Sequence, residues 1–154
     1  MKNSIINVSI IGNTNSGKST FLNTVIGKTV SITNKKRNTT IESIIGILNT
    51  NNTQIIIHDT PGLAYIKSKL QKFRQIKINL WNSIIISNVI LYIIDVTKKK
   101  ISINNDIIYY LKKEKKDIII LLNKVDLINK TKLIPIINDI SNEYNLNNIF
   151  PISS

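Results

Sequence analysis

The chain has 154 residues, with 21 Lys and Arg against nine Asp and Glu, and carries a formal net charge of +12. This length fits one domain with an ordinary hydrophobic core. The absence of cysteine excludes disulfides, thiol catalysis and cysteine-based zinc sites, and a single histidine excludes a multi-histidine metal site. The charge fits either a nucleic-acid or anionic-surface partner, or solvated lysine-rich faces in a composition biased toward Ile, Asn and Lys.

The first predicted elements are an apolar strand over residues 5–11 and a helix over residues 20–26. Between them, Gly-Asn-Thr-Asn-Ser-Gly-Lys-Ser at residues 12–19 matches the phosphate loop G-x-x-x-x-G-K-[ST] in the strand–loop–helix context that the motif needs. Glycines let successive backbone N–H groups turn toward an anion, and the helix N-terminus adds partial positive charge. Lys18 can reach the β- and γ-phosphates, and the Ser19 hydroxyl can hold Mg²⁺. The predicted phosphate-binding residues are Gly12, Asn13, Asn15, Ser16, Gly17, Lys18, Ser19 and Thr20.

A polar segment over residues 28–40 follows, and a loop of this length is unusual unless it has a function. Strands are predicted over residues 43–48 and 54–58, and the turn-forming residues between them indicate an antiparallel hairpin. Asp59-Thr60-Pro61-Gly62 ends the second strand sharply. Asp59 is placed to hold Mg²⁺, and the Gly62 N–H to meet a γ-phosphate. His58 points to the opposite face of the strand, which predicts a structural position rather than a general base.

Thr40, at the end of the polar segment, is a candidate to give its hydroxyl to the same Mg²⁺. The alternative is a loop threonine with a local hydrogen bond. If the first interpretation holds, phosphate contacts order two loops and hydrolysis releases them, as in a molecular switch. Lys18, Thr40 and Gly62 are then the candidate catalytic residues.

The remaining chain alternates helices and buried strands. Apolar spacing predicts a helix over residues 68–85, with Trp81 in the core, and an all-apolar strand over residues 89–94 that ends at Asp95. A helix from Ser102, a strand over residues 118–122, a helix over residues 131–144 interrupted by Pro135, and a strand over residues 149–152 follow.

This order of elements predicts an α/β fold with a mostly parallel six-stranded sheet, one antiparallel strand and helices on both faces. In such sheets ligands bind at the carboxyl ends of the strands. The phosphate loop, Asp59, Asn123 and Ser153 all follow predicted strands, so we expect them to converge on one site.

Asn123-Lys124-Val125-Asp126 is the second decisive motif. The Asp126 carboxylate only accepts hydrogen bonds, and guanine offers it two donors, N1–H and the 2-amino group. Adenine offers neither, and such a mismatch can discriminate by roughly 10⁴-fold. Asn123 can donate to N7 of the base, and the Lys124 stem can lie along the ring. The motif, after an apolar strand and downstream of a phosphate loop, predicts binding of guanine nucleotide rather than ATP.

In the order and spacing of its motifs the whole chain resembles the bacterial Era GTPases. The motifs that carry the resemblance are the phosphate loop, Ser31-Ile32-Thr33 leading to Thr39-Thr40, Asp59-Thr60-Pro61-Gly62-Leu63, Asn123-Lys124-Val125-Asp126 and Phe150-Pro151-Ile152-Ser153. The loop from Ile32 to Thr40 favours Era over its relatives TrmE and Der. The resemblance implies a P-loop GTPase fold, GTP hydrolysis with Mg²⁺, and a guanine loop that includes Ser153 and Ser154.

The resemblance also implies a role in maturing the small ribosomal subunit, whose rRNA this family grips at its 3′ end with a C-terminal KH domain. It further implies a monomer, peripheral association with membranes, and a location in the bacterial cytoplasm or in an organelle of bacterial origin.

Three departures limit the comparison. Ile41 stands where the family has Arg, and Ser154 replaces the Ala of the guanine loop. The sequence stops at Ser154, inside that loop, so residues 1–154 are expected to form a GTPase domain without its last helix or a KH domain. Either the chain is a fragment, which we favour, or it is a reduced form.

Leu63 occupies the position where Ras-like proteins place the Gln that orients the attacking water. Asn15 matches the phosphate-loop Asn that coordinates K⁺ in TrmE and Der relatives, so we hypothesise that K⁺ beside Asn15 replaces an arginine finger. Two alternatives to an Era-like switch stay open. One is a nucleotide-gated RNA- or partner-binding module with little hydrolysis, and the other is a TrmE- or Der-type GTPase in tRNA modification or large-subunit assembly.

Overall fold

The structure is a computed structural model, and it describes residues 4–27, 45–50, 52–63, 71, 74–101 and 103–154. Thr40, the predicted polar loop over residues 28–40, Ile41 and Ser102 lie outside the described residues, as does most of the start of the helix predicted over residues 68–85.

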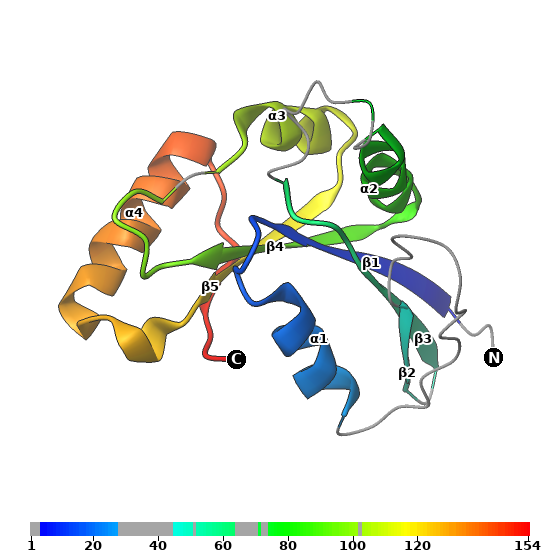
Figure 1. Ribbon diagram of the computed structural model, residues 1–154, viewed down its shortest axis with the longest axis horizontal. Coiled ribbons are helices and arrows are strands. Elements are labelled where there is room, and N and C mark those ends of the chain that lie inside the picture. Colours follow the sequence, from blue (N-terminus) through cyan, green and yellow to red (C-terminus); the bar gives the residue numbers. More distant parts are fainter. Residues whose placement is uncertain (1–3, 28–44, 51, 64–70, 72–73, 102) are drawn as a thin grey trace.

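A six-stranded sheet forms the centre of the molecule, in the order β2-β3-β1-β4-β5-β6 (Figure 1). Strands β2 and β3 pair antiparallel, and every other neighbouring pair is parallel. The predicted mostly parallel sheet with one antiparallel strand is therefore confirmed. The strands are β1 (Ser4–Gly12), β2 (Ile45–Asn49), β3 (Thr53–Asp59), β4 (Val89–Asp95), β5 (Asp117–Asn123) and β6 (Ile149–Pro151).

Helices cover both faces of the sheet, as predicted (Figure 1). Helix α1 packs on one face, where Leu22 and Ile26 meet Ile10 and Ile57. The other three helices share a second cluster with residues such as Tyr92 on the opposite face. The helices are α1 (Lys18–Ile26), α2 (Arg74–Ile86), α3 (Asn105–Lys113) and α4 (Leu133–Tyr144), and 3₁₀ turns occupy Val125–Leu127 and Lys130–Lys132.

The strand register brings the predicted site segments to one edge of the sheet. In β1, Ile10 lies opposite Asp59 of β3, and Gly12 lies opposite Ile93 of β4. Asp95 at the end of β4 lies opposite Asn123 at the end of β5. Because these strands run parallel, their carboxyl ends open on the same side, which is where ligands bind in α/β sheets.

Helix α4 differs from its prediction at the start. Pro135 does not interrupt it: the helix begins at Leu133, and the proline lies in the first turn, where its missing N–H has no helical partner to lose. Preceding residues form the 3₁₀ turn Lys130–Lys132. Within the described part of the chain, no helix has the length and apolar character needed to span a bilayer.

Candidate functional site

The segment between β1 and α1 adopts a tight loop. The Ser16 N–H donates to the Asn13 carbonyl at 3.2 Å, and Asn15 has φ 63°. Gly17 has φ 96°, and a Cβ at this residue would lie 2.2 Å from Asn123 Nδ2. Only glycine allows this left-handed conformation and this close approach together, so the second glycine of the motif serves contact with the Asn123 loop as well as the turn.

Lys18 opens α1 with its ammonium folded back over the loop. Nζ donates to the carbonyl oxygens of Asn13 at 2.9 Å and Gly12 at 3.3 Å, and the residue is 8% exposed. Burial lowers the pKa of Lys18, and the nearby Asp59 carboxylate opposes that shift. A cation this buried, held mainly by neutral carbonyls, favours an incoming anion.

Ser19 and Asp59 meet across the loop, where Ser19 Oγ donates to Asp59 Oδ2 at 2.9 Å. Asp59 Oδ1 is buried without a hydrogen-bond partner, as is Ser16 Oγ. Burial raises the pKa of Asp59, against the Ser19 hydrogen bond and the Lys18 charge. Mg²⁺ is a hard cation that prefers oxygen ligands, so a carboxylate oxygen without a partner, next to a hydroxyl, suits it.

The described residues contain no group of three or more His, Cys, Asp or Glu side chains placed to hold a metal ion. Mg²⁺ bound with phosphates usually has few protein ligands and keeps several waters, so Ser19 and Asp59 are compatible with such a site.

The segment after β3 packs against the phosphate loop. Thr60 Oγ1 donates to the Ile10 carbonyl at 2.6 Å, and a Cβ on Gly62 would lie 2.5 Å from Thr14 Oγ1. Leu63 is 3% exposed and belongs to the core cluster with Leu80. The side chain of residue 63 therefore supplies no polar atom to orient a water molecule.

Asn123 is fully buried and ties three segments together. Its Nδ2 donates to the Ser16 carbonyl at 2.9 Å. Its Oδ1 accepts from the Lys124 N–H at 2.8 Å and from both the N–H and Oγ of Ser154 at 3.1 Å. The amide therefore joins the loop after β5 to the phosphate loop and to residue 154, and its contact with N7 of the base stays a prediction.

Asp126 and Ser153 come together at the exposed side of this loop. Ser153 Oγ donates to Asp126 Oδ1 at 2.6 Å, and the Val125 N–H donates to the Ile152 carbonyl at 3.3 Å. Both side chains are exposed, so the carboxylate is open to a ligand. Thr20, Asn13 and Asn15 are exposed as well, at the mouth of the phosphate loop.

Sequence reasoning missed Asp95 and Thr97 as site residues. Lys124 Nζ donates to Asp95 Oδ2 at 2.8 Å and to the Asn15 carbonyl at 3.0 Å. Asp95 Oδ1 in turn accepts from the N–H and Oγ1 of Thr97. The sequence did contain one signal, because Asp95 is a carboxylate at the end of an apolar strand. Its partner Lys124 could not be predicted, because that contact depends on β4 lying beside β5.

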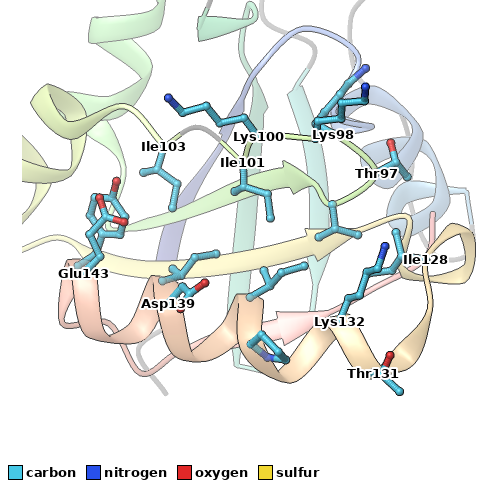
Figure 2. A pocket seen from close by; sticks show the side chains of 16 residues that line it. Thr97, Lys98, Lys100, Ile101, Ile103, Ile128, Thr131, Lys132, Asp139 and Glu143 are labelled. Carbon is cyan, nitrogen blue, oxygen red and sulfur yellow. The ribbon is translucent and has the colours of Figure 1, made fainter.

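A groove of about 720 Å³ lies between the β4–α3 loop and α4 (Figure 2). Ile101, Ile103 and Ile128 line it, Lys98 and Lys100 extend from its loop side, and Asp139 belongs to its α4 side. None of the predicted nucleotide-binding residues lines it. Lys98 and Lys100 also line a smaller hollow of about 240 Å³ with Asn13, Thr14 and Asp95, so these lysines reach the phosphate loop as well.

Residues 7–124 match the family model described as 50S ribosome-binding GTPase. The chain belongs to this GTPase family. The match begins in β1 and ends within the Asn123-Lys124 motif, so it includes the phosphate loop and the Asp59 segment.

The chain is also similar to individual Era proteins. It is 38% identical to GTPase Era of Rickettsia bellii in an alignment of 153 residues, and the match covers 97% of this chain and 50% of that protein. Its fold matches a single-residue variant of Aquifex aeolicus Era bound to GDP·AlF₄⁻ with a TM-score of 0.75 and 32% identity, over 97% of this chain and 51% of that one. An Era in complex with MgGDPNP and nucleotides 1506–1542 of 16S ribosomal RNA matches with a TM-score of 0.71, 32% identity and the same coverage.

These matches confirm the resemblance to Era and the P-loop GTPase fold. The chain spans about half the length of the Era proteins it matches.

Proposed function

We propose that the chain binds GTP and hydrolyses it to GDP and phosphate as an Era-like molecular switch. The observation that carries the proposal is the direct joining of two loops: Asn123 donates to the Ser16 carbonyl and Lys124 to the Asn15 carbonyl. Phosphate recognition and base recognition therefore belong to one pocket. Asp126, exposed on the second loop, is then the group that selects guanine.

In this proposal the ammonium of Lys18 leaves its loop carbonyls for the β- and γ-phosphates, and the N–H groups of residues 13–20 surround the phosphates. Ser19 and Asp59 hold Mg²⁺, which neutralises charge on the phosphates when bound. Gly62 meets the γ-phosphate through its N–H. Thr40 remains a proposed Mg²⁺ ligand on the basis of the motif.

We further propose that K⁺ beside Asn15 replaces an arginine finger, in a site where the Leu63 side chain has no group to position water. Asn15 is exposed at the mouth of the loop, and Leu63 is buried in the core. Replacing Na⁺ by K⁺ should therefore accelerate GTP hydrolysis at constant ionic strength. Equal single-turnover rates in the two salts would contradict the role of K⁺. That result would not contradict the proposal that the chain binds GTP.

We propose the small ribosomal subunit and its rRNA as the partner, because the similar Era structure contains nucleotides of 16S rRNA. The family description names the 50S subunit, which favours the large subunit as a second candidate. Co-sedimentation of the GTP-loaded protein with purified 30S and 50S subunits separates them: retention on 50S alone would contradict the proposal. A bacterial cytoplasm, a monomer and peripheral membrane contact complete the proposal by similarity to Era.

Single-turnover hydrolysis of GTP tests the enzymatic part. Without a partner we expect a rate constant on the order of 10⁻⁴ to 10⁻² per second. Lys18→Ala should abolish nucleotide binding, whereas Lys113→Ala, which removes an exposed lysine from the end of α3, should leave the rate unchanged. GTP that stays bound and intact for many hours in the unmodified protein would favour the binding-only module.

A further inference from the structure

We propose that Asp95 is a positioning residue for nucleotide recognition, holding the Lys124 side chain across the base site while Thr97 holds Asp95. The inference rests on the proposed function, because it assigns a role within the guanine-nucleotide pocket. Asp95 and Thr97 act through Lys124 and are not expected to touch the nucleotide.

The Lys124 ammonium bridges two segments of the pocket. It lies 2.8 Å from Asp95 Oδ2 and 3.0 Å from the Asn15 carbonyl, so it connects the end of β4 with the phosphate loop. A lysine stem is long and flexible, and a single neutral acceptor would hold it loosely. The charged contact with Asp95 is what selects one position for the stem, beside the loop that carries Asp126.

Asp95 is itself held rigidly. Its side chain is 6% exposed, and its Oδ1 accepts from the Thr97 N–H at 2.9 Å and from Thr97 Oγ1 at 2.6 Å. Each carboxylate oxygen therefore has its own partner, which leaves Oδ2 directed at Lys124. Burial alone would raise the pKa of Asp95, but the hydrogen bonds from Lys124 and Thr97 outweigh it and keep the carboxyl below its usual pKa.

The sheet connects Asp95 to the guanine motif. Asp95 lies opposite Asn123, and the Val96 N–H donates to the Asn123 carbonyl at 3.2 Å. The backbone therefore fixes the distance between Asp95 and the start of the motif. Lys124 has φ 67°, a conformation that costs energy in a residue other than glycine and requires surrounding contacts to hold it.

These contacts predict an effect on retention of the nucleotide rather than on the chemical step. Asp95→Asn removes the charge but keeps the shape. We expect it to weaken GDP and GTP about tenfold each, chiefly through faster dissociation. The rate constant for hydrolysis of bound GTP should stay within about twofold of the unmodified value.

The measurement is dissociation of a fluorescent GDP analogue, together with single-turnover hydrolysis and thermal unfolding without nucleotide. Asp139→Asn, which removes a charge of the same type from an exposed site on α4, is the matched control. Unchanged GDP dissociation in Asp95→Asn would overturn the inference, and so would a loss confined to the hydrolysis rate.

A double-mutant cycle tests whether Asp95 acts through Lys124. If it does, Asp95→Asn combined with Lys124→Met binds GDP no more weakly than Lys124→Met alone, whereas additive losses would contradict the inference. If Asp95→Asn fails to fold, the variants Thr97→Val and Thr97→Ser test the inference instead. Only the valine variant should lose affinity for GDP, because serine keeps the hydroxyl that donates to Asp95. Failure of the unmodified protein to retain GDP would instead contradict the proposed function itself.

Discussion

In the proposed function, two charged side chains, Lys18 and Asp126, decide what the site binds. Lys18 is buried and faces carbonyl oxygens that cannot neutralise it, so it favours phosphate. Asp126 is exposed and accepts only from Ser153 among the hydrogen bonds found for it, so its carboxylate is open to the base. Both residues were predicted from motif spacing, because the chemistry of a phosphate and of guanine restricts which residue types serve.

The choice of guanine can be changed at one residue. Asp126→Asn replaces an acceptor by a donor, which removes a partner for the N1–H and 2-amino groups of guanine and adds one for a carbonyl at position 2. We expect GDP to bind at least about a hundredfold more weakly and xanthosine diphosphate to bind more tightly. Competition assays with both nucleotides measure this, and an Asp126→Asn protein that still prefers GDP would contradict the role of the carboxylate.

His58 should make stability depend on pH. It is buried, its Nε2 lies 3.4 Å from Asn7 Oδ1, and burial lowers its pKa from the usual value near 6.5. The unfolded chain therefore takes up a proton at a higher pH than the folded chain. The stability that neutral His58 contributes is present above about pH 6.5 and is lost as the pH falls through the folded pKa.

Urea unfolding at about pH 7.5 and about pH 5.5 measures this loss, and His58→Gln should show a smaller decrease between the two pH values. An equal decrease in both proteins would assign the pH dependence to other groups. The structural position of His58 was predicted from strand alternation, and its contact with Asn7 agrees with it.

At the scale of elements, the predicted strands and the predicted starts of α1 and α4 agree with the structure to within two residues, whereas α3 begins three residues later than predicted. This helix was predicted to begin at Ser102. Asn104 caps the described helix: its Oδ1 accepts from the Ile107 N–H, and its own N–H donates to Tyr92 Oη at 3.0 Å. The start of α3 therefore depends in part on Tyr92, which lies in β4.

Two lysines, Lys112 in the last turn of α3 and Lys116 just after it, contact neighbouring elements. Lys112 donates to the Tyr144 carbonyl, and Lys116 donates to the carbonyls of Ile85 at 2.8 Å and Ser87 at 2.6 Å. These acceptors lie at the C-terminal ends of α4 and α2, where cations complement the helix dipole. Lys112 and Lys116 therefore bind carbonyl groups at the C-terminal ends of neighbouring helices.

The cap of α3 can be tested directly. Asn104→Ala removes the side-chain acceptor for the Ile107 N–H and should lower the free energy of unfolding by about 1 kcal/mol. Asn104→Ser keeps an acceptor and should lose less. Urea denaturation of both variants measures the difference, and an alanine variant as stable as the original protein would show that the cap contributes nothing.

At the scale of the whole molecule, the function depends on the order of strands in the sheet. Alternating strands and helices predicted the class of fold, but not that β1 lies between β3 and β4, with β5 next to β4. That order brings Gly12, Asp59, Asp95 and Asn123 to one edge. It also creates contacts invisible in the sequence, such as Asn123 with Ser16 and Lys124 with Asp95.

In the function proposed for this chain, one pocket binds phosphates through the loop before α1 and selects guanine through the loop after β5. Calorimetric titration of the protein with GDP and with ADP, each in the presence of Mg²⁺, tests this claim most directly. We predict that GDP binds and that ADP fails to displace it even at about a thousandfold excess, in line with discrimination of roughly 10⁴. Equal affinity for the two nucleotides, or no binding of GDP, would contradict it.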